Sequence, residues 1–283
     1  MMKKVFCLLW CVILFSSCGK AKEETSSVSL SVSLAPQKHF LQMIVGDFAE
    51  VHVLVPSGTN PEVYDPSPAE IAKLEDSRAY FAIGTLPFET EWVKALPEDV
   101  EVIDQAKLLP QDLIFSHDGK HAHVHIHGDP HYWTSVTGAR AMAEVMLKEL
   151  IRLFPDEEEL FRENYKHLEG EINDIEKLAK ATFEDKDEVA FVIYHPSLSL
   201  FADEWNLHQL VIEENGLEPT ARHLVRLMDE AKRLDTKVVL IQEEFDTKNA
   251  ESIGTALELP LRTIHPLAEN WKEEMKQLIC SFE

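Results

Sequence analysis

Stretches of strand character alternate with helical stretches along almost the whole chain of 283 residues, and this alternation limits the folds that it can adopt. The expected strands lie at 29–34, 51–55, 79–83, 189–194, 238–242 and 261–264. The expected helices between them lie at 36–46, from 68, at 220–234, at 249–257 and from 270. Strands separated by crossover helices pair in parallel. The pattern therefore predicts an α/β fold with parallel, doubly wound sheets.

Two longer helical stretches, 135–154 and 156–183, interrupt the alternation near the middle of the chain. A helix of about 28 residues would be about 42 Å long at 1.5 Å per residue, which is long enough to run beside two lobes. We therefore expect Rossmann-like lobes at 28–155 and 186–283, joined by a rigid linker helix at 156–185. Ligands of parallel sheets bind beyond the carboxyl ends of the strands, which places the expected site in the cleft between the lobes.

The N-terminus has the features of an export signal. Two lysines precede an apolar run at 5–15, which ends in the sequence FSSC at Cys18. A run of about 11 residues is too short to cross a bilayer of roughly 30 Å as a helix and is typical of a secretory signal peptide, with a buried N-terminal strand as the alternative. FSSC resembles the lipobox of bacterial lipoproteins. The resemblance implies that signal peptide 1–17 is removed, that Cys18 is lipidated, and that 18–27 tethers an exported domain facing the periplasm or the cell surface.

Acidic residues outnumber basic ones, with 50 Asp plus Glu against 27 Lys plus Arg and a formal net charge of −23. Such a surface repels the phosphate backbone, so we expect no nucleic-acid partner. It attracts cations, although a solvated acidic face without any ligand is the alternative. After removal of the signal peptide and lipidation of Cys18, Cys280 is the remaining cysteine, so we expect no intramolecular disulfide. We also expect a monomer.

Histidines are concentrated in one loop, 117–129, and just after it, where six of the 13 fall within 15 residues. These six are His117, His121, His123, His125, His127 and His131. Neutral imidazole is a good zinc ligand, but a loop without fixed structure loses conformational entropy when it orders around one ion. We interpret the first five as an auxiliary metal-capture tract. A polar loop that binds nothing is the alternative.

Four residues at strand ends or before a helix are candidates for an ordered metal site. Glu62 lies in the loop after an expected strand, and His131 precedes a helix. His195 and His265 each follow a strand and precede a proline. A single loop histidine is more often solvated than bound to metal, so the prediction rests on the combination of four residues, two from each lobe.

Several segments together resemble a known family. They are VLVPSGTNPEVYDPSPAEI, the histidine-rich loop, DPHYWTS, FVIYHPSLSLFADEWNL, GLEPTARHL, IQEEFDTKNA and TIHPLAENW. From about Ser29 to the C-terminus, the chain is similar to the zinc and manganese solute-binding proteins of bacterial ABC importers, the ZnuA-like and TroA-like group. The resemblance implies two α/β lobes joined by a long helix, a transported metal ion in the cleft and a membrane permease as partner. It also implies a transport protein and not an enzyme.

Two positions depart from the pattern of that family. Glu62 stands where the family usually has His, and His265 stands where Asp is common. His131 and His195 match their family positions directly, so three imidazoles and one carboxylate remain. This set suits tetrahedral Zn²⁺ better than Mn²⁺, which prefers oxygen ligands. Zn²⁺ is therefore the expected cargo.

Alternatives stay open at this point. If Glu62 is not a ligand, the three histidines and a water would form the open site of a zinc-dependent metallohydrolase, although HExxH, G-x-S-x-G and Gly-rich phosphate-loop motifs are absent from the sequence. A zinc buffer or an adhesin without an importer would keep the site and change only the partner. Glu243 and Glu244 follow the strand at 238–242 and are candidates for a substitute or supporting ligand, with a solvated acidic turn as the alternative.

Overall fold

The computed structural model describes residues 28–114, 129–186, 189–214, 216–242, 244–245 and 247–283. In these ranges the strands are β1 (Val28–Val32), β2 (Ala49–Val53), β3 (Ala79–Ala82), β4 (Glu101–Asp104), β5 (Val189–Ile193), β6 (His208–Val211), β7 (Asp235–Gln242) and β8 (Leu261–Ile264). The helices are α1 (Ala35–Val45), α2 (Pro68–Glu75), α3 (Pro87–Trp92), α4 (Gln105–Leu108), α5 (Gln111–Ile114), α6 (Val136–Leu153), α7 (Glu158–Phe183), α8 (Ser199–Glu204), α9 (Ala221–Arg233), α10 (Lys248–Leu257) and α11 (Trp271–Cys280). The expected signal peptide and tether, with Cys18, lie outside the described residues, as do the five loop histidines and Glu243.

The strands form two parallel four-stranded sheets with equivalent strand orders, β2-β1-β3-β4 and β6-β5-β7-β8. In the first sheet Leu30 of β1 is opposite Val51 of β2 on one side and Ala79 of β3 on the other. The interior strand β5 is buried along its whole length, because helices cover both faces of the sheet. The two-lobe parallel α/β fold expected from the alternation is confirmed.

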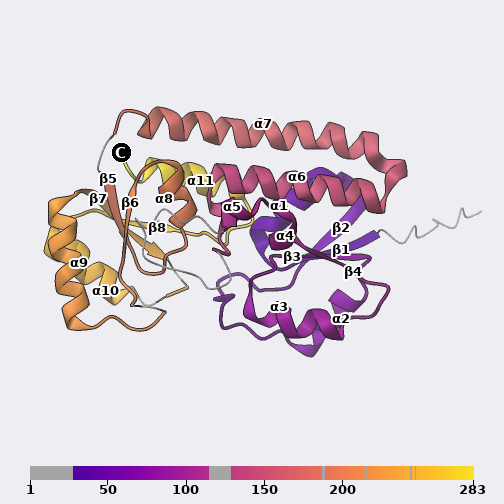
Figure 1. Cartoon of the computed structure of the whole chain (residues 1–283), viewed down its shortest axis with the longest axis horizontal. Coiled ribbons are helices and arrows are strands. Elements are labelled where there is room, and N and C mark those ends of the chain that lie inside the picture. The colour runs from indigo at the N-terminus through magenta and orange to yellow at the C-terminus, as the bar shows by residue number, and fades with distance from the viewer. Residues whose placement is uncertain (1–27, 115–128, 187–188, 215, 243, 246) are drawn as a thin grey trace, which may run out of the picture.

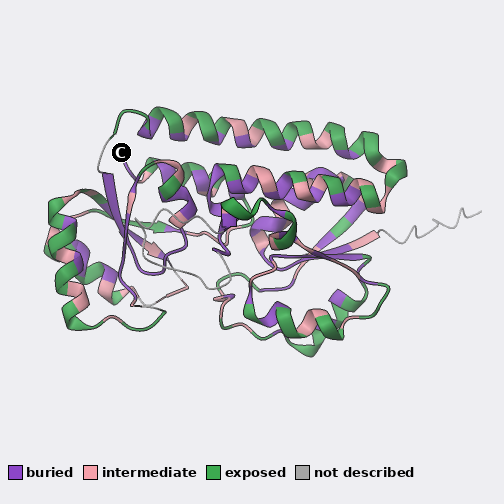
Figure 2. Cartoon of the chain, viewed as in Figure 1, coloured by how far each residue is buried: buried purple, intermediate pink, exposed green. Residues whose placement is uncertain are grey.

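Helix α7 runs along one side of both lobes (Figure 1). Its 26 residues correspond to a length of about 39 Å. It contacts α1 and α6 beside the first sheet and α11 beside the second. Its inner side is buried or half-buried and its outer side is largely exposed (Figure 2). The helix therefore ties the two lobes together along one side, as expected of the linker.

One continuous apolar cluster fills the first lobe and reaches across to the second. Phe40 of α1 and Trp271 of α11 belong to it, and their ring centroids lie 5.1 Å apart. A smaller cluster lies on the other face of the second sheet, where Val192 and Val239 pack with Leu227 of α9 and Ile253 of α10. The core therefore holds the two lobes in contact at the seam between them.

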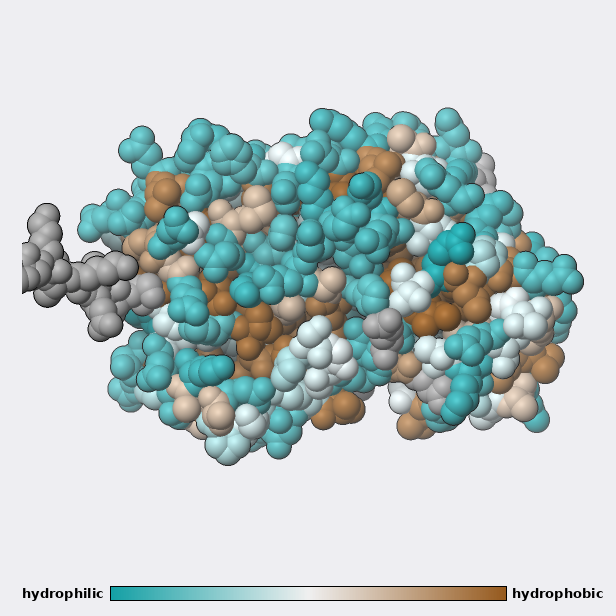
Figure 3. All heavy atoms as spheres, turned by 180° about the vertical axis from the view of Figure 1, so that it is seen from behind, coloured by the Kyte–Doolittle hydropathy of each residue, from teal (hydrophilic) through white to brown (hydrophobic). Residues whose placement is uncertain are grey.

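Most of the molecular face seen in Figure 3 is hydrophilic, with apolar side chains confined to scattered patches. This agrees with the large excess of acidic residues in the sequence. Within the described ranges, no helix combines the length and the apolar character needed to cross a membrane. Cys280, the cysteine in those ranges, has an exposed free thiol.

Candidate metal site

His195 lies where the strand order of the second sheet reverses. It follows β5 within two residues, and its backbone N–H donates to Oε1 of Gln242, the last residue of the neighbouring strand β7, at 2.9 Å. The connection after β5 leads to β6 on one side, and the connection after β7 leads to β8 on the other side. A crevice forms between two such diverging connections. The Gln242 side chain spans it by donating from Nε2 to Ser197 Oγ at 2.9 Å. The backbone that carries the imidazole is thereby fixed.

His131 comes from the short segment that leads into α6. Oδ1 of Asp129 accepts from the backbone N–H of His131 at 2.8 Å and lies 2.9 Å from its ring Nδ1. Ser135 caps the following helix by accepting from Gly138 N–H at 3.0 Å. Carboxylates and hydroxyls at such positions satisfy backbone groups that the helix leaves unpaired. The DPHYWTS motif is therefore a helix entry that holds one imidazole in a set direction.

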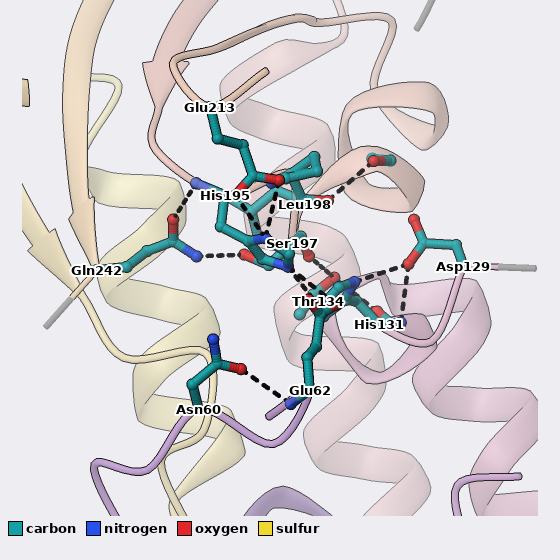
Figure 4. Close-up of polar contacts among 12 residues, drawn as sticks. Asn60, Glu62, Asp129, His131, Thr134, His195, Ser197, Leu198, Glu213 and Gln242 are labelled. Carbon is teal, nitrogen blue, oxygen red and sulfur yellow. Dashed lines mark hydrogen bonds and ion pairs between the residues drawn. The ribbon is translucent and has the colours of Figure 1, made fainter. Parts of the chain in front are cut away.

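Glu62 reaches the same place from the first lobe, on the loop between β2 and α2 (Figure 4). Gly58 turns this loop with φ +75°, and Asn60 Oδ1 accepts from the Glu62 N–H at 2.9 Å. The Glu62 side chain is 34% exposed, against 6% for His195. The carboxylate is thus the solvent-facing member of the group.

The ligand atoms of Glu62, His131 and His195 converge, and all lie within 4.8 Å of one another. Nε2 of His195 lies 3.4 Å from Nε2 of His131 and 3.4 Å from Oε1 of Glu62. Figure 4 shows the three side chains pointing toward a common space. Three of the four predicted site residues are therefore adjacent.

A carboxylate lies behind each imidazole. Asp129 contacts Nδ1 of His131, and both oxygens of Glu213 lie 3.2 Å from Nδ1 of His195. A carboxylate accepts hydrogen bonds only, so each Nδ1 carries a proton. In a neutral ring the lone pair is then on Nε2, which faces the common space. The sequence reasoning assigned no role to Asp129 or Glu213, although Glu213 lies just past the carboxyl end of β6.

The surroundings of His195 also change its acidity. Burial lowers the pKa of His195, but hydrogen bonds and charge interactions with Glu213 and Glu62 outweigh it and raise the pKa to about 9. Phe245 stacks on the imidazole, with centroids 4.9 Å apart and planes 15° from parallel. At neutral pH the His195 ring is therefore an imidazolium between two carboxylates.

His265 has a different position from the other three. It is half-buried and is not part of the converging group, although the next two residues, Pro266 and Leu267, line the same cavity. Glu274 accepts from the backbone N–H of His265 at 2.6 Å, which fixes the main chain there. Glu244 also lines this cavity. His265 stays a prediction as a ligand.

The two lobes are joined by hydrogen bonds next to the site. The Trp133 indole N–H donates to the Pro266 carbonyl at 2.7 Å, and the Trp271 indole N–H donates to the Trp133 carbonyl at 2.6 Å. Thr134 Oγ1 donates to the Ser197 carbonyl at 2.9 Å. These bonds link the segment after His131 to the second lobe. The two imidazoles consequently keep their mutual position.

Comparisons with known proteins agree with this architecture. The chain is 26% identical over 292 residues to the high-affinity zinc uptake system protein ZnuA of Bacillus subtilis, covering 95% of this chain and 90% of that protein. It is 25% identical over 296 residues to the zinc-binding lipoprotein AdcA of Streptococcus pneumoniae strain R6, covering 97% of this chain but only 57% of that protein.

A solved structure is similar as well. The crystal structure of a ZnuA deletion mutant with zinc bound superimposes with a TM-score of 0.79 at 31% identity, covering 89% of this chain and 95% of the other. A family model described as zinc-uptake complex component A periplasmic matches residues 31–281. The resemblance inferred from the sequence motifs is confirmed. The chain belongs to this ZnuA family.

Proposed function

We propose that this protein captures Zn²⁺ in its cleft and delivers the ion to an ABC importer. The observation that carries the proposal is the 3.4 Å separation of the two imidazole Nε2 atoms, repeated between His195 and Glu62. Two ligands at about 2.0–2.1 Å from a tetrahedral zinc ion lie about 3.3–3.4 Å apart. The geometry of these two pairs therefore matches the spacing that a bound ion requires.

Glu62, His131 and His195 are the proposed ligands. The two imidazoles are buried and held by Asp129 and Glu213, so little reorganisation accompanies binding. Glu62 neutralises part of the cation's charge and, being the most exposed of the three, meets the incoming ion first. His265 is the further ligand proposed from sequence, and its ring would have to turn into the cavity.

The remaining parts of the proposal concern capture and delivery. Lipidation at Cys18 would hold the protein at the membrane, and the histidines of the 117–129 loop would collect ions near the cleft. The loaded lobes would then dock on a membrane permease that competes for the metal. The zinc-uptake and zinc-binding roles for which the similar proteins are named support this proposal. A hydrolase is less well supported, because the similar proteins are named for zinc uptake or zinc binding.

Calorimetric titration of zinc into the domain lacking residues 1–27 tests the proposal. We expect one tight site in the wild type, and clearly weaker binding in Glu62→Ala, because two imidazoles and solvent then remain. The absence of a tight site in the wild type would refute zinc capture. Tight binding unaffected by Glu62→Ala would instead leave an open site of histidines, and hydrolase assays would become the next step.

The acidity of His195 predicts a proton release on binding. Its pKa of about 9 means that the ring is protonated at neutral pH, whereas a zinc ligand must be neutral. Binding at pH 7.5 should release about one proton, and affinity should fall about tenfold for each pH unit below about 9. Calorimetry in buffers of different ionisation enthalpy measures this number. An apparent enthalpy that is the same in every buffer at pH 7.5 would contradict the prediction.

A further inference from the structure

Three converging ligand atoms do not complete the coordination of a tetrahedral ion. They lie on the wall of a solvent-open cavity, which extends toward the loop between β7 and α10. Glu244 and Phe245 of that loop line the cavity. A fourth ligand has to come from this wall or from solvent.

Apart from the three converging residues, the polar side chains on the wall already form hydrogen bonds, with one exception. Asn60 accepts from the Glu62 N–H at 2.9 Å. Gln242 bonds the His195 N–H and the Ser197 hydroxyl, each at 2.9 Å. These amides and the hydroxyl already serve to position His195 or Glu62 through those bonds.

Glu244 is the exception. It is half-buried, and within the described part of the chain its carboxylate forms no hydrogen bond or ion pair. A partly desolvated carboxylate without a donor is unfavourable, and a cation removes that cost. The next residue, Phe245, stacks on the His195 ring at 4.9 Å, so the loop that carries Glu244 is held against a proposed ligand.

We propose that Glu244 supplies the fourth ligand of the captured ion, an inference that rests on the proposed function of zinc capture. The coordination then consists of two imidazoles and two carboxylates, with one carboxylate from each lobe. Two carboxylates balance the two positive charges of the ion within the ligand set. The main chain of His265 is held by Glu274 and by Ala268, and its ring is not part of the converging group.

Zinc affinity measured by competition with a chromophoric chelator tests this assignment in four proteins: wild type, Glu244→Gln, Glu98→Gln and His265→Ala. Glu98 is exposed in the first lobe, so Glu98→Gln removes the same charge away from the cavity. Glu244→Gln should weaken binding at least about tenfold, the lower end of the loss seen when even a supporting residue of a metal site is removed. Added acetate should restore part of the affinity by supplying a carboxylate.

The outcomes separate this inference from the function on which it rests. A wild type without tight zinc binding would refute the proposed function itself. Tight wild-type binding that Glu244→Gln leaves unchanged would overturn the inference alone, and a loss in His265→Ala would then identify the histidine as the fourth ligand. Equal losses in Glu244→Gln and Glu98→Gln would also overturn it, since charge alone would explain them. A loss confined to Glu244→Gln and relieved by acetate supports it.

Discussion

His195→Ala is expected to abolish tight zinc binding. The imidazole is buried and lies 3.4 Å from the proposed ligand atoms of both His131 and Glu62. Its removal takes away one of the two imidazoles of the proposed ligand set, and it exposes Glu213 to a cavity that no longer provides a donor. The loss of zinc affinity should exceed the decrease of about 10–100-fold that is typical when a residue supporting a metal ligand is removed. Competition titration against a strong chelator measures it.

The matched control is His167→Ala, which removes an exposed histidine from α7 far along the chain from the ligands. It should bind zinc as the wild type does. The far-ultraviolet circular dichroism of both variants should match that of the wild type, because the substitutions remove a side chain and leave the secondary structure intact. Wild-type affinity in His195→Ala would contradict the proposed site.

Gly138→Ala is expected to damage both the fold and the site. Gly138 lies in the first turn of α6, and a Cβ there would come within 2.0 Å of the Tyr132 carbonyl oxygen and 2.7 Å of Ser135 Oγ. Backbone cannot yield as a flexible side chain does, so the turn after His131 must shift. Overpacking of this kind typically costs about 1–3 kcal/mol, and the shift should also weaken zinc binding.

Gly170→Ala provides the comparison for this prediction. Gly170 lies within α7, and a Cβ there meets nothing within 4 Å. Alanine favours a helix interior over glycine by about 0.5–1 kcal/mol, so this variant should be more stable than the wild type. Urea unfolding measures both changes. Unfolding of Gly138→Ala at the wild-type midpoint, with unchanged slope, would show that the turn has room for the methyl group.

The architecture followed from the sequence because it depends on periodicity over long segments. Two strands, β4 and β6, were nevertheless missed. β4 has only Val102 and Ile103 as apolar residues, and β6 begins with His208 and Gln209. Both are short and pair with an interior strand at one side only, so their existence depends on tertiary pairing and not on local pattern.

The chemistry of the candidate site could be predicted from the sequence, but the full set of residues that form it could not. Glu62, His131 and His195 were proposed because each lies in a loop that follows or precedes a regular element, which is where parallel sheets place ligands. The structure brings the three together, and their role as ligands stays a prediction. The position of His265 depends on a hydrogen bond from its own backbone to Glu274 nine residues later, which leaves no pattern in the sequence. Glu213 likewise comes close to Nδ1 of His195 only because β6 pairs with β5.

The shared apolar core has a consequence for how the empty and loaded proteins differ. Since one cluster includes side chains of both lobes, opening the seam exposes core to water. An ion held across that seam would raise the stability of the whole chain by RT ln(1 + [L]/Kd), about 4.1 kcal/mol at 1,000 times Kd. Zinc supply would then set the lifetime of the molecule against proteases, because unloaded copies would unfold more often than loaded ones.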